Sequence, residues 1–236
     1  FWDYACLPQL PRTRDEEARF RKGLAFCAVL YSLSESCVLM QTRLPDGFMG
    51  RDYHSSGWCF FEASVSCIFK DADLRLDLGM DDARTDFALM KLKCTAHRTP
   101  PLTPDKFNEE LDRKTFTTNA DRGAVKDLYR DTFLAATSSC TYLRLGNLQW
   151  GIGELGMLTE ALPYFSNVNA IDLSHNKCGY FAIARICELL GSNTAILPVI
   201  QELCFYECDA SATSIAELKA RANRPSLRIM LQKEVI

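Results

Sequence analysis

The sequence of 236 residues lacks the features that mark several common protein classes. It has only 3 histidines, no Cys-x-x-Cys pair and no glycine-rich phosphate loop with a lysine, so the common zinc and nucleotide-phosphate signatures are missing. Its 27 basic residues are balanced by 30 acidic ones, which excludes the basic surplus of a typical nucleic-acid binder. The longest apolar run, residues 24–33, is far shorter than the about 20 residues that a membrane-spanning helix needs. We therefore expect no metal site, no resident cofactor, no nucleic-acid partner and no membrane span.

Cysteine, by contrast, is abundant, with 11 in total. The number is odd, and most cysteines lie in apolar surroundings such as the segment 25–29, which is how reduced, buried thiols occur in proteins. The disulfide framework of a secreted domain is therefore not expected, and the composition favours a cytoplasmic protein. The chain opens at Phe1 without a methionine, so we expect further residues, and any targeting signal, upstream.

The first region, residues 1–95, alternates strand-like and helix-like patterns. Residues 1–4 and 37–40 are short apolar segments typical of strands, whereas apolar residues recur at helical spacing within 15–34. The segment 58–69 follows a loop with proline and glycine and predicts a second helix. Alternating strands and helices are typical of a parallel sheet covered by helices, so the region is expected to be α/β. The acidic stretch 71–77 has arginine and leucine where a calcium loop needs a ligand and a glycine, and we expect a solvated loop there.

Residues 96–135 differ from the first region in composition. They open with Pro100, Pro101 and Pro104 and continue as charged sequence with apolar residues at helical spacing, such as Phe107 and Leu111. A proline-rich opening followed by modest helices predicts a linker with a small helical element.

An internal repeat occupies the last region, residues 136–236. Each copy has two apolar residues two positions apart, followed three positions later by a leucine, asparagine or cysteine, and helical patterns at 155–162, 181–190 and 215–222 separate the copies. The spacing of 24 to 32 residues is that of leucine-rich repeats. We expect strands around these pairs to join in parallel: Leu143 and Leu145, Ile171 and Leu173, Leu203 and Phe205, and as a fourth copy Leu227 and Ile229.

This repeat resembles the ribonuclease-inhibitor-like class of leucine-rich repeat, which places asparagine or cysteine where this chain has Asn176 and Cys208. The resemblance implies a short solenoid in which these two side chains bond to backbone groups in the turn after each strand. It also implies a concave face on the outward strand positions, where a protein partner would bind. The residues expected there are Tyr142, Arg144, Asp172, Cys204 and Tyr206.

The stretch 53–62 contains Ser56, Trp58, Cys59 and Glu62 and resembles the serine-x-Trp-Cys-x-x-Glu box of TIR and TIR-like domains. The order of strands and helices around it agrees with an incomplete TIR or flavodoxin-like sheet that lacks the first strand and first helix. In the catalytic members of that family, the helix glutamate supports cleavage of the nicotinamide–ribose bond of NAD. The resemblance therefore implies Glu62 as a catalytic residue and Trp58 as a substrate-binding one, because a carboxylate stabilises an oxocarbenium-like transition state.

The sequence thus predicts an α/β protein with a partial TIR-like domain (1–95), a proline-led helical linker (96–135) and a leucine-rich-repeat module (136–236). We expect an intracellular interaction or signalling module that binds a protein through the repeats and that can self-associate through the TIR-like part. The alternative is a TIR-type NAD hydrolase, with NAD as substrate, that the repeats regulate.

Overall fold

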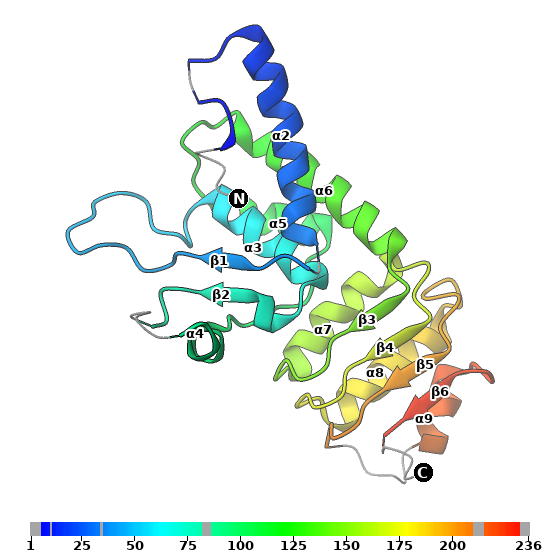
Figure 1. Ribbon diagram of the computed structural model, residues 1–236. Helices are drawn as coiled ribbons and strands as arrows, with labels where there is room; N and C mark the ends of the chain where they lie inside the picture. The colour runs from blue at the N-terminus through cyan, green and yellow to red at the C-terminus, as the bar shows by residue number, and fades with distance from the viewer. Residues whose placement is uncertain (1–5, 10, 34, 82–85, 210–214, 232–236) are drawn as a thin grey trace.

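The computed structural model describes residues 6–9, 11–33, 35–81, 86–209 and 215–231. The described chain is α/β, with one two-stranded and one four-stranded parallel sheet. Figure 1 shows the smaller sheet beside the helices of the N-terminal half and the larger one in the C-terminal half. The strand expected at 1–4 lies outside the described residues.

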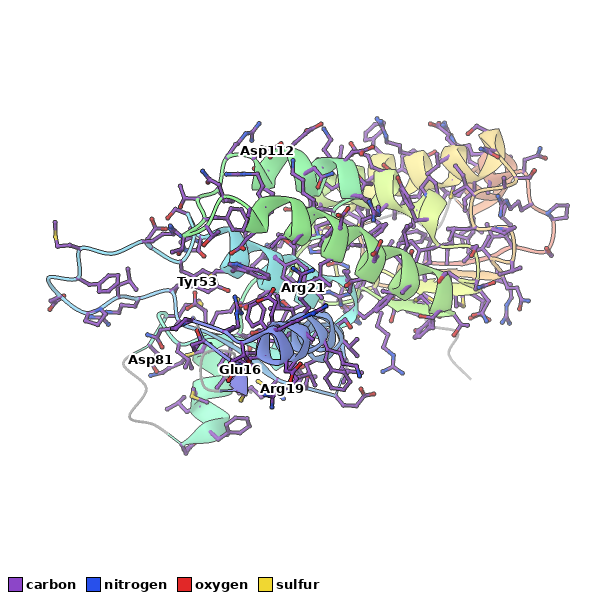
Figure 2. All side chains as sticks on the ribbon, turned by 90° about the horizontal axis from the view of Figure 1, so that it is seen from above. Glu16, Arg19, Arg21, Tyr53, Asp81 and Asp112 are labelled. Carbon is purple, nitrogen blue, oxygen red and sulfur yellow. The ribbon has the colours of Figure 1, made fainter. Side chains whose placement is uncertain are left out.

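The smaller sheet pairs β1 (Val38–Met40) in parallel with β2 (Arg75–Asp77). Around it lie α2 (Arg14–Ser32), α3 (Gly57–Phe69), the short 3-10 helix η1 (Ala72–Leu74) and α4 (Phe87–Cys94). The expected helices and the strand at 37–40 are confirmed. The solvated loop expected at 71–77 is wrong in its second half, because Arg75 and Leu76 are buried in β2. The long loop between β1 and α3 projects beyond the sheet, and Tyr53 lies at its base (Figure 2).

Helices α5 (Pro104–Leu111) and α6 (Asp121–Ser139) occupy the segment expected to be a linker. Pro104 stands at the first position of α5, where its missing N–H costs nothing, and the Thr103 side chain caps that helix by accepting from the Lys106 N–H at 3.4 Å. The rings of Phe107 and Tyr129 stack at 3.7 Å between centroids, and both are fully buried. The segment expected as a linker with a small helical element therefore contains two helices whose aromatic residues belong to the packed core.

The larger sheet has the order β3-β4-β5-β6, which confirms the parallel pairing expected of the first three repeat copies. The fourth copy also joins in parallel, but Ile229 and not Leu227 stands opposite Leu203. Its strands are β3 (Tyr142–Arg144), β4 (Ala170–Asp172), β5 (Glu202–Cys204) and β6 (Arg228–Met230). The central residues Leu143, Ile171, Leu203 and Ile229 stand side by side in register and are all buried. Helices α7 (Ile152–Ala161), α8 (Gly179–Ser192) and α9 (Ile215–Ala222) cover one face of this sheet (Figure 1), with the 3-10 helix η2 (Leu162–Tyr164) after α7.

One hydrophobic core joins the two halves. The ring of Phe69 at the end of α3 meets Phe165 edge to face, with centroids 6.5 Å apart. The buried indole of Trp150 donates from Nε1 to the Arg98 carbonyl at 2.6 Å, across a separation of 52 residues. The described chain therefore folds around shared contacts and not around two independent cores. Within it, no helix combines the length and apolar character needed to cross a membrane.

Candidate functional site

The open face of the four-stranded sheet lies opposite α7, α8 and α9, and no described helix covers it (Figure 1). Two cross-strand rows of side chains run over it, because residues in register on neighbouring parallel strands point to the same side. We call these rows, together with Tyr206 just beyond β5, the open face. The first row is Tyr142, Ala170, Glu202 and Arg228, and the second is Arg144, Asp172, Cys204 and Met230.

Polar contacts fix several side chains of the open face. The guanidinium of Arg144 lies over the ring of Tyr142, 5.7 Å from its centroid. The Tyr206 hydroxyl donates to the sulfur of Met230 at 3.1 Å. Partial burial, and secondarily the carboxylate of Asp172, raise the pKa of the Tyr142 hydroxyl, which therefore stays protonated and able to donate. An open face with aligned tyrosine and arginine side chains has the residue types that dominate binding energy in protein interfaces.

The structure brings the five predicted partner-binding residues onto one face, but it corrects the expected exposure of Cys204. Tyr142 is 42% exposed and Arg144 is exposed, whereas Cys204 is 9% exposed and lies within the sheet surface. Burial raises the pKa of the Cys204 thiol to about 11, so this cysteine is neither a prominent contact nor a reactive thiolate at neutral pH. Alternation along the strand predicted the outward direction of this side chain but not its burial.

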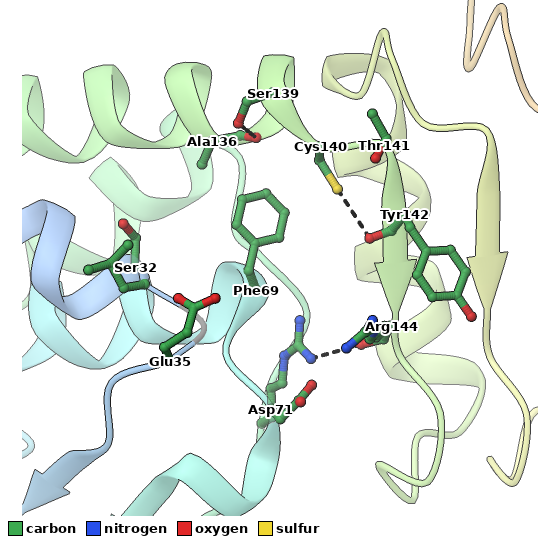
Figure 3. A pocket seen from close by; sticks show the side chains of 12 residues that line it. Ser32, Glu35, Phe69, Asp71, Ala136, Ser139, Cys140, Thr141, Tyr142 and Arg144 are labelled. Atoms are coloured by element: carbon green, nitrogen blue, oxygen red, sulfur yellow. Dashed lines mark hydrogen bonds between the residues drawn. The ribbon is translucent and has the colours of Figure 1, made fainter.

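A cavity of about 530 Å³ adjoins the open face. Figure 3 shows Tyr142 and Arg144 of β3 on one side of it, and Glu35 and Asp71 on the other. Its volume falls within the range of about 300–1,000 Å³ that is typical of ligand-binding pockets. The cavity therefore extends the open face into a recess with charges of both signs.

Three helices end beside this recess: α2, α3 and α6, none of which carries a basic residue in its own last turn. Buried cations bond to the carbonyls at the ends of α2 and α3 instead: Lys70 donates to the Leu33 carbonyl after α2, and Arg98 donates at the end of α3. Arg98 donates to the carbonyls of Cys67 at 3.0 Å and Ile68 at 2.9 Å, and also to that of Arg144 at 2.9 Å. Burial lowers the pKa of Arg98 to about 10, so it remains charged at neutral pH. This arginine, which the sequence analysis did not single out, ties the end of α3 to β3.

Glu62 and Trp58, the residues implied by the TIR-like resemblance, line a second cavity of about 220 Å³. Both side chains are half-buried on α3, and the Trp58 indole donates to the carboxylate of Asp121 at 3.2 Å. Leu7 and Gln9 line the same cavity from the segment before α2. The two predicted residues therefore share one enclosure, although its other walls are largely apolar.

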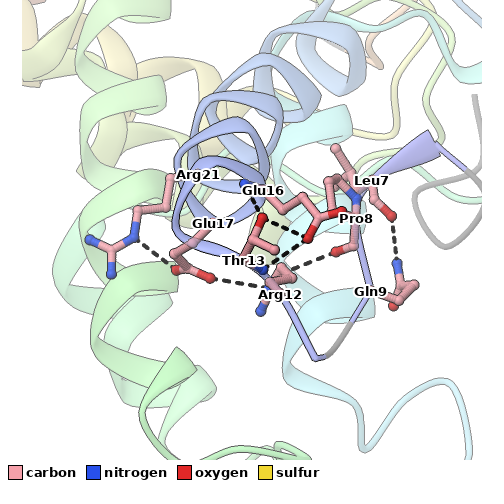
Figure 4. Close-up of polar contacts among 8 residues, drawn as sticks. All are labelled: Leu7, Pro8, Gln9, Arg12, Thr13, Glu16, Glu17 and Arg21. Carbon is pink, nitrogen blue, oxygen red and sulfur yellow. Dashed lines mark hydrogen bonds and ion pairs between the residues drawn. The ribbon is translucent and has the colours of Figure 1, made fainter.

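A capping box fixes the start of α2, the helix whose later turns line this second cavity. The Thr13 hydroxyl oxygen accepts from the Glu16 N–H at 3.3 Å, and the Glu16 carboxylate accepts from the Thr13 N–H at 2.8 Å (Figure 4). These bonds also lower the pKa of Glu16. In the same view, Arg12 bonds to the Pro8 carbonyl at 3.4 Å and so holds the preceding segment against the helix.

Among the described residues, no three histidine, cysteine, aspartate or glutamate side chains gather as a metal site would require. The chain matches no family model, and no curated protein matches its sequence. The case for any function therefore depends on the geometry of the open face and of the cavities.

Proposed function

We propose that this chain is a protein-interaction module that binds a partner through the open face. The observation that carries the proposal is the alignment of Tyr142, Arg144, Asp172 and Tyr206 on a sheet face that no described helix covers. Tyrosine provides large contact area at low entropic cost and arginine provides planar hydrogen bonding, which suits a protein surface better than a small molecule. The resemblance to leucine-rich repeats supports the same use, with the open face as the concave surface of a short solenoid.

The recess beside the open face adds specificity to this proposal. A partner that covers Tyr142 and Arg144 can place one side chain in the recess, between the carboxylates of Glu35 and Asp71 and the aromatic ring of Phe69. Because the recess has charges of both signs, it favours a side chain whose charged group lies next to a residue of opposite charge, and the sign of that group alone does not decide binding. The proposed function is therefore recognition of a protein surface, with a signalling role in the intracellular setting that the sequence favours.

A photo-crosslinking experiment in cells tests the proposal. A photoreactive phenylalanine analogue replaces Tyr142 on the open face or Phe181, which is 80% exposed on α8, on the opposite side of the sheet. We expect the analogue at position 142 to give one discrete crosslinked protein, and we expect that product to be absent when the analogue is at position 181. Arg144→Ala should reduce that crosslink about tenfold or more, as loss of an interface hot spot does, whereas Arg185→Ala on α8 should leave it unchanged. Identical products from both positions would refute binding through the open face.

The second candidate function is NAD hydrolysis, favoured by the shared enclosure of Glu62 and Trp58. In this reading Glu62 stabilises the oxocarbenium-like transition state and Trp58 forms a wall of the site. The enclosure of about 220 Å³ is smaller than the lower limit of about 300 Å³ for ordinary ligand sites, so NAD would require α2 to move. Nicotinamide release that Glu62→Ala abolishes, but that the exposed control Glu160→Ala retains, would support this reading. Equal release from the two variants would remove Glu62 from it.

A further inference from the structure

A third cavity, of about 400 Å³, lies at the carboxyl ends of β1 and β2. Met40 and Asp77, the last residues of the two strands, line it together with Tyr53 from the adjoining loop. The face of α3 that carries Ala63 and Ser64 forms another wall. None of its lining residues is shared with the recess or with the cavity of Glu62. Open parallel sheets bind ligands at this end of their strands.

Arg75 is the buried charge in this cavity, with an exposed fraction of 3%. Its Nε donates to the Ser66 hydroxyl at 3.0 Å and its Nη1 to the His97 carbonyl at 2.7 Å. Both partners are neutral, and within the described chain Arg75 has no carboxylate partner and Nη2 no hydrogen bond. Buried cations in proteins are normally paired with an anion, since desolvation of a lone charge is costly. Arg75 therefore retains the capacity to bind an anionic group that enters the cavity.

The cavity also holds one carboxylate and one phenol hydroxyl. The Asp77 carboxylate accepts hydrogen bonds from the Thr42 hydroxyl and, at 2.8 Å, from the Gly79 N–H, which hold it at the strand end without neutralising its charge, so Arg75 is the group to which an anion would bind. Burial, together with the nearby Cys59 and Glu62, raises the pKa of the Tyr53 hydroxyl, which stays protonated and available as a donor. Most of the remaining wall is apolar, including Phe60 and Leu102.

We infer that this cavity binds a small planar aromatic carboxylate, whose ring lies against the apolar wall and whose anionic group pairs with Arg75. The volume suits a ligand of one or two fused rings, and a charge-assisted bond to an arginine in a desolvated site is among the stronger polar contacts. The site lies apart from the open face, so the inference does not depend on the proposed protein partner.

Isothermal titration calorimetry with two probes of the same shape tests the inference. 2-Naphthoate carries the carboxylate, and 2-naphthamide replaces it with a neutral amide. We expect 2-naphthoate to bind once per chain, about tenfold or more tighter than 2-naphthamide, because only the carboxylate completes the charge pair with Arg75. No saturable binding of 2-naphthoate, or equal affinity for the two probes, would overturn the inference.

Variants locate the binding. Met157→Trp adds bulk at the rim of the cavity and should abolish 2-naphthoate binding, whereas Met49→Trp makes the same change at a 96% exposed loop position and should not. Arg75→Met should reduce 2-naphthoate affinity to that of 2-naphthamide, with circular dichroism as the check that the variant folds. If Arg75→Met does not fold, the comparison of probes and of the two Trp variants still decides the question. Binding that Met157→Trp leaves intact would place the probe elsewhere and refute the inference.

Discussion

Replacement of Asn176 by alanine should strongly destabilise the described fold. This side chain is 2% exposed and makes four hydrogen bonds to backbone groups, three in the turn after β3 and one directly after β4. Its Oδ1 accepts from the N–H groups of Leu148 and Trp150, each at 3.0 Å, and its Nδ2 donates to the carbonyls of Leu145 at 2.7 Å and Leu173 at 2.8 Å. Alanine cannot replace any of these bonds, and the site is too enclosed for water to reach easily.

The magnitude follows from the number of bonds. A net contribution of about 0.5–1.5 kcal/mol per bond gives a loss of about 2–6 kcal/mol in the free energy of unfolding. Since about 2–4 °C of melting temperature corresponds to 1 kcal/mol in a chain of this size, we expect a fall of about 8–16 °C for a loss near 4 kcal/mol. Urea denaturation and thermal melts followed by circular dichroism measure both quantities.

Lys177→Ala is the matched control, because its side chain is adjacent in sequence but exposed. It should change stability by less than about 0.5 kcal/mol. An Asn176→Ala variant that loses less than about 1 kcal/mol, or no more than Lys177→Ala, would refute the view that this amide holds the turn together.

Two further predictions concern burial. Leu173→Asp should unfold the repeat strands, because it would place an unpaired carboxylate between neighbouring repeats where Leu173 has no exposed surface. The control Asp172→Ala should change the free energy of unfolding by less than about 1 kcal/mol. Equal melting temperatures of the two variants would contradict the prediction. Tyr129→Phe should cost about 1 kcal/mol at neutral pH through loss of the 2.8 Å bond to the Leu102 carbonyl. Burial raises the pKa of Tyr129 above its ordinary value of 10.0, so the unfolded chain loses this proton first and stability should fall as pH rises beyond about 10. That alkaline loss, measured by urea denaturation between pH 8 and 11, should be smaller in Tyr129→Phe, and an unchanged slope would exclude Tyr129 as its source.

The repeat strands could be predicted from the sequence because the information is local. Two buried residues with an outward residue between them recur at a regular interval, so the positions of Ile171 and Leu203 in register follow from the pattern. The same holds for α9, whose observed bounds are those expected. Asn176 bonds to turn backbone as expected, although only Leu173 follows its own strand and the other three partners lie in the turn of the preceding repeat.

The sequence analysis missed features that depend on distant contacts. Arg75 lies in an acidic stretch and was expected in solvent, yet it is buried because the Ser66 hydroxyl and the His97 carbonyl, 9 and 22 residues away, accept its hydrogen bonds. Pro100 and Pro101 suggested a linker but are buried. Arg98 gave no local signal, since one of its three acceptor carbonyls lies 46 residues away on Arg144. The partners of Arg75 and Arg98 do not recur at a fixed interval as the repeat contacts do, so no periodic pattern in the sequence indicates them.

A series of hydrogen bonds from Asn176 through Trp150 to Arg98 links the two halves of the protein and limits how they can be combined with parts of other proteins. Asn176 holds the backbone of Trp150, the Trp150 indole bonds to the Arg98 carbonyl, and the Arg98 guanidinium holds the end of α3. An exchange of the repeats for those of another protein would remove Trp150, and with it the hydrogen bond that holds the Arg98 backbone beside α3. The two halves therefore cannot be exchanged independently of each other. A chimera that folds would have to retain Asn176, Trp150 and Arg98 together.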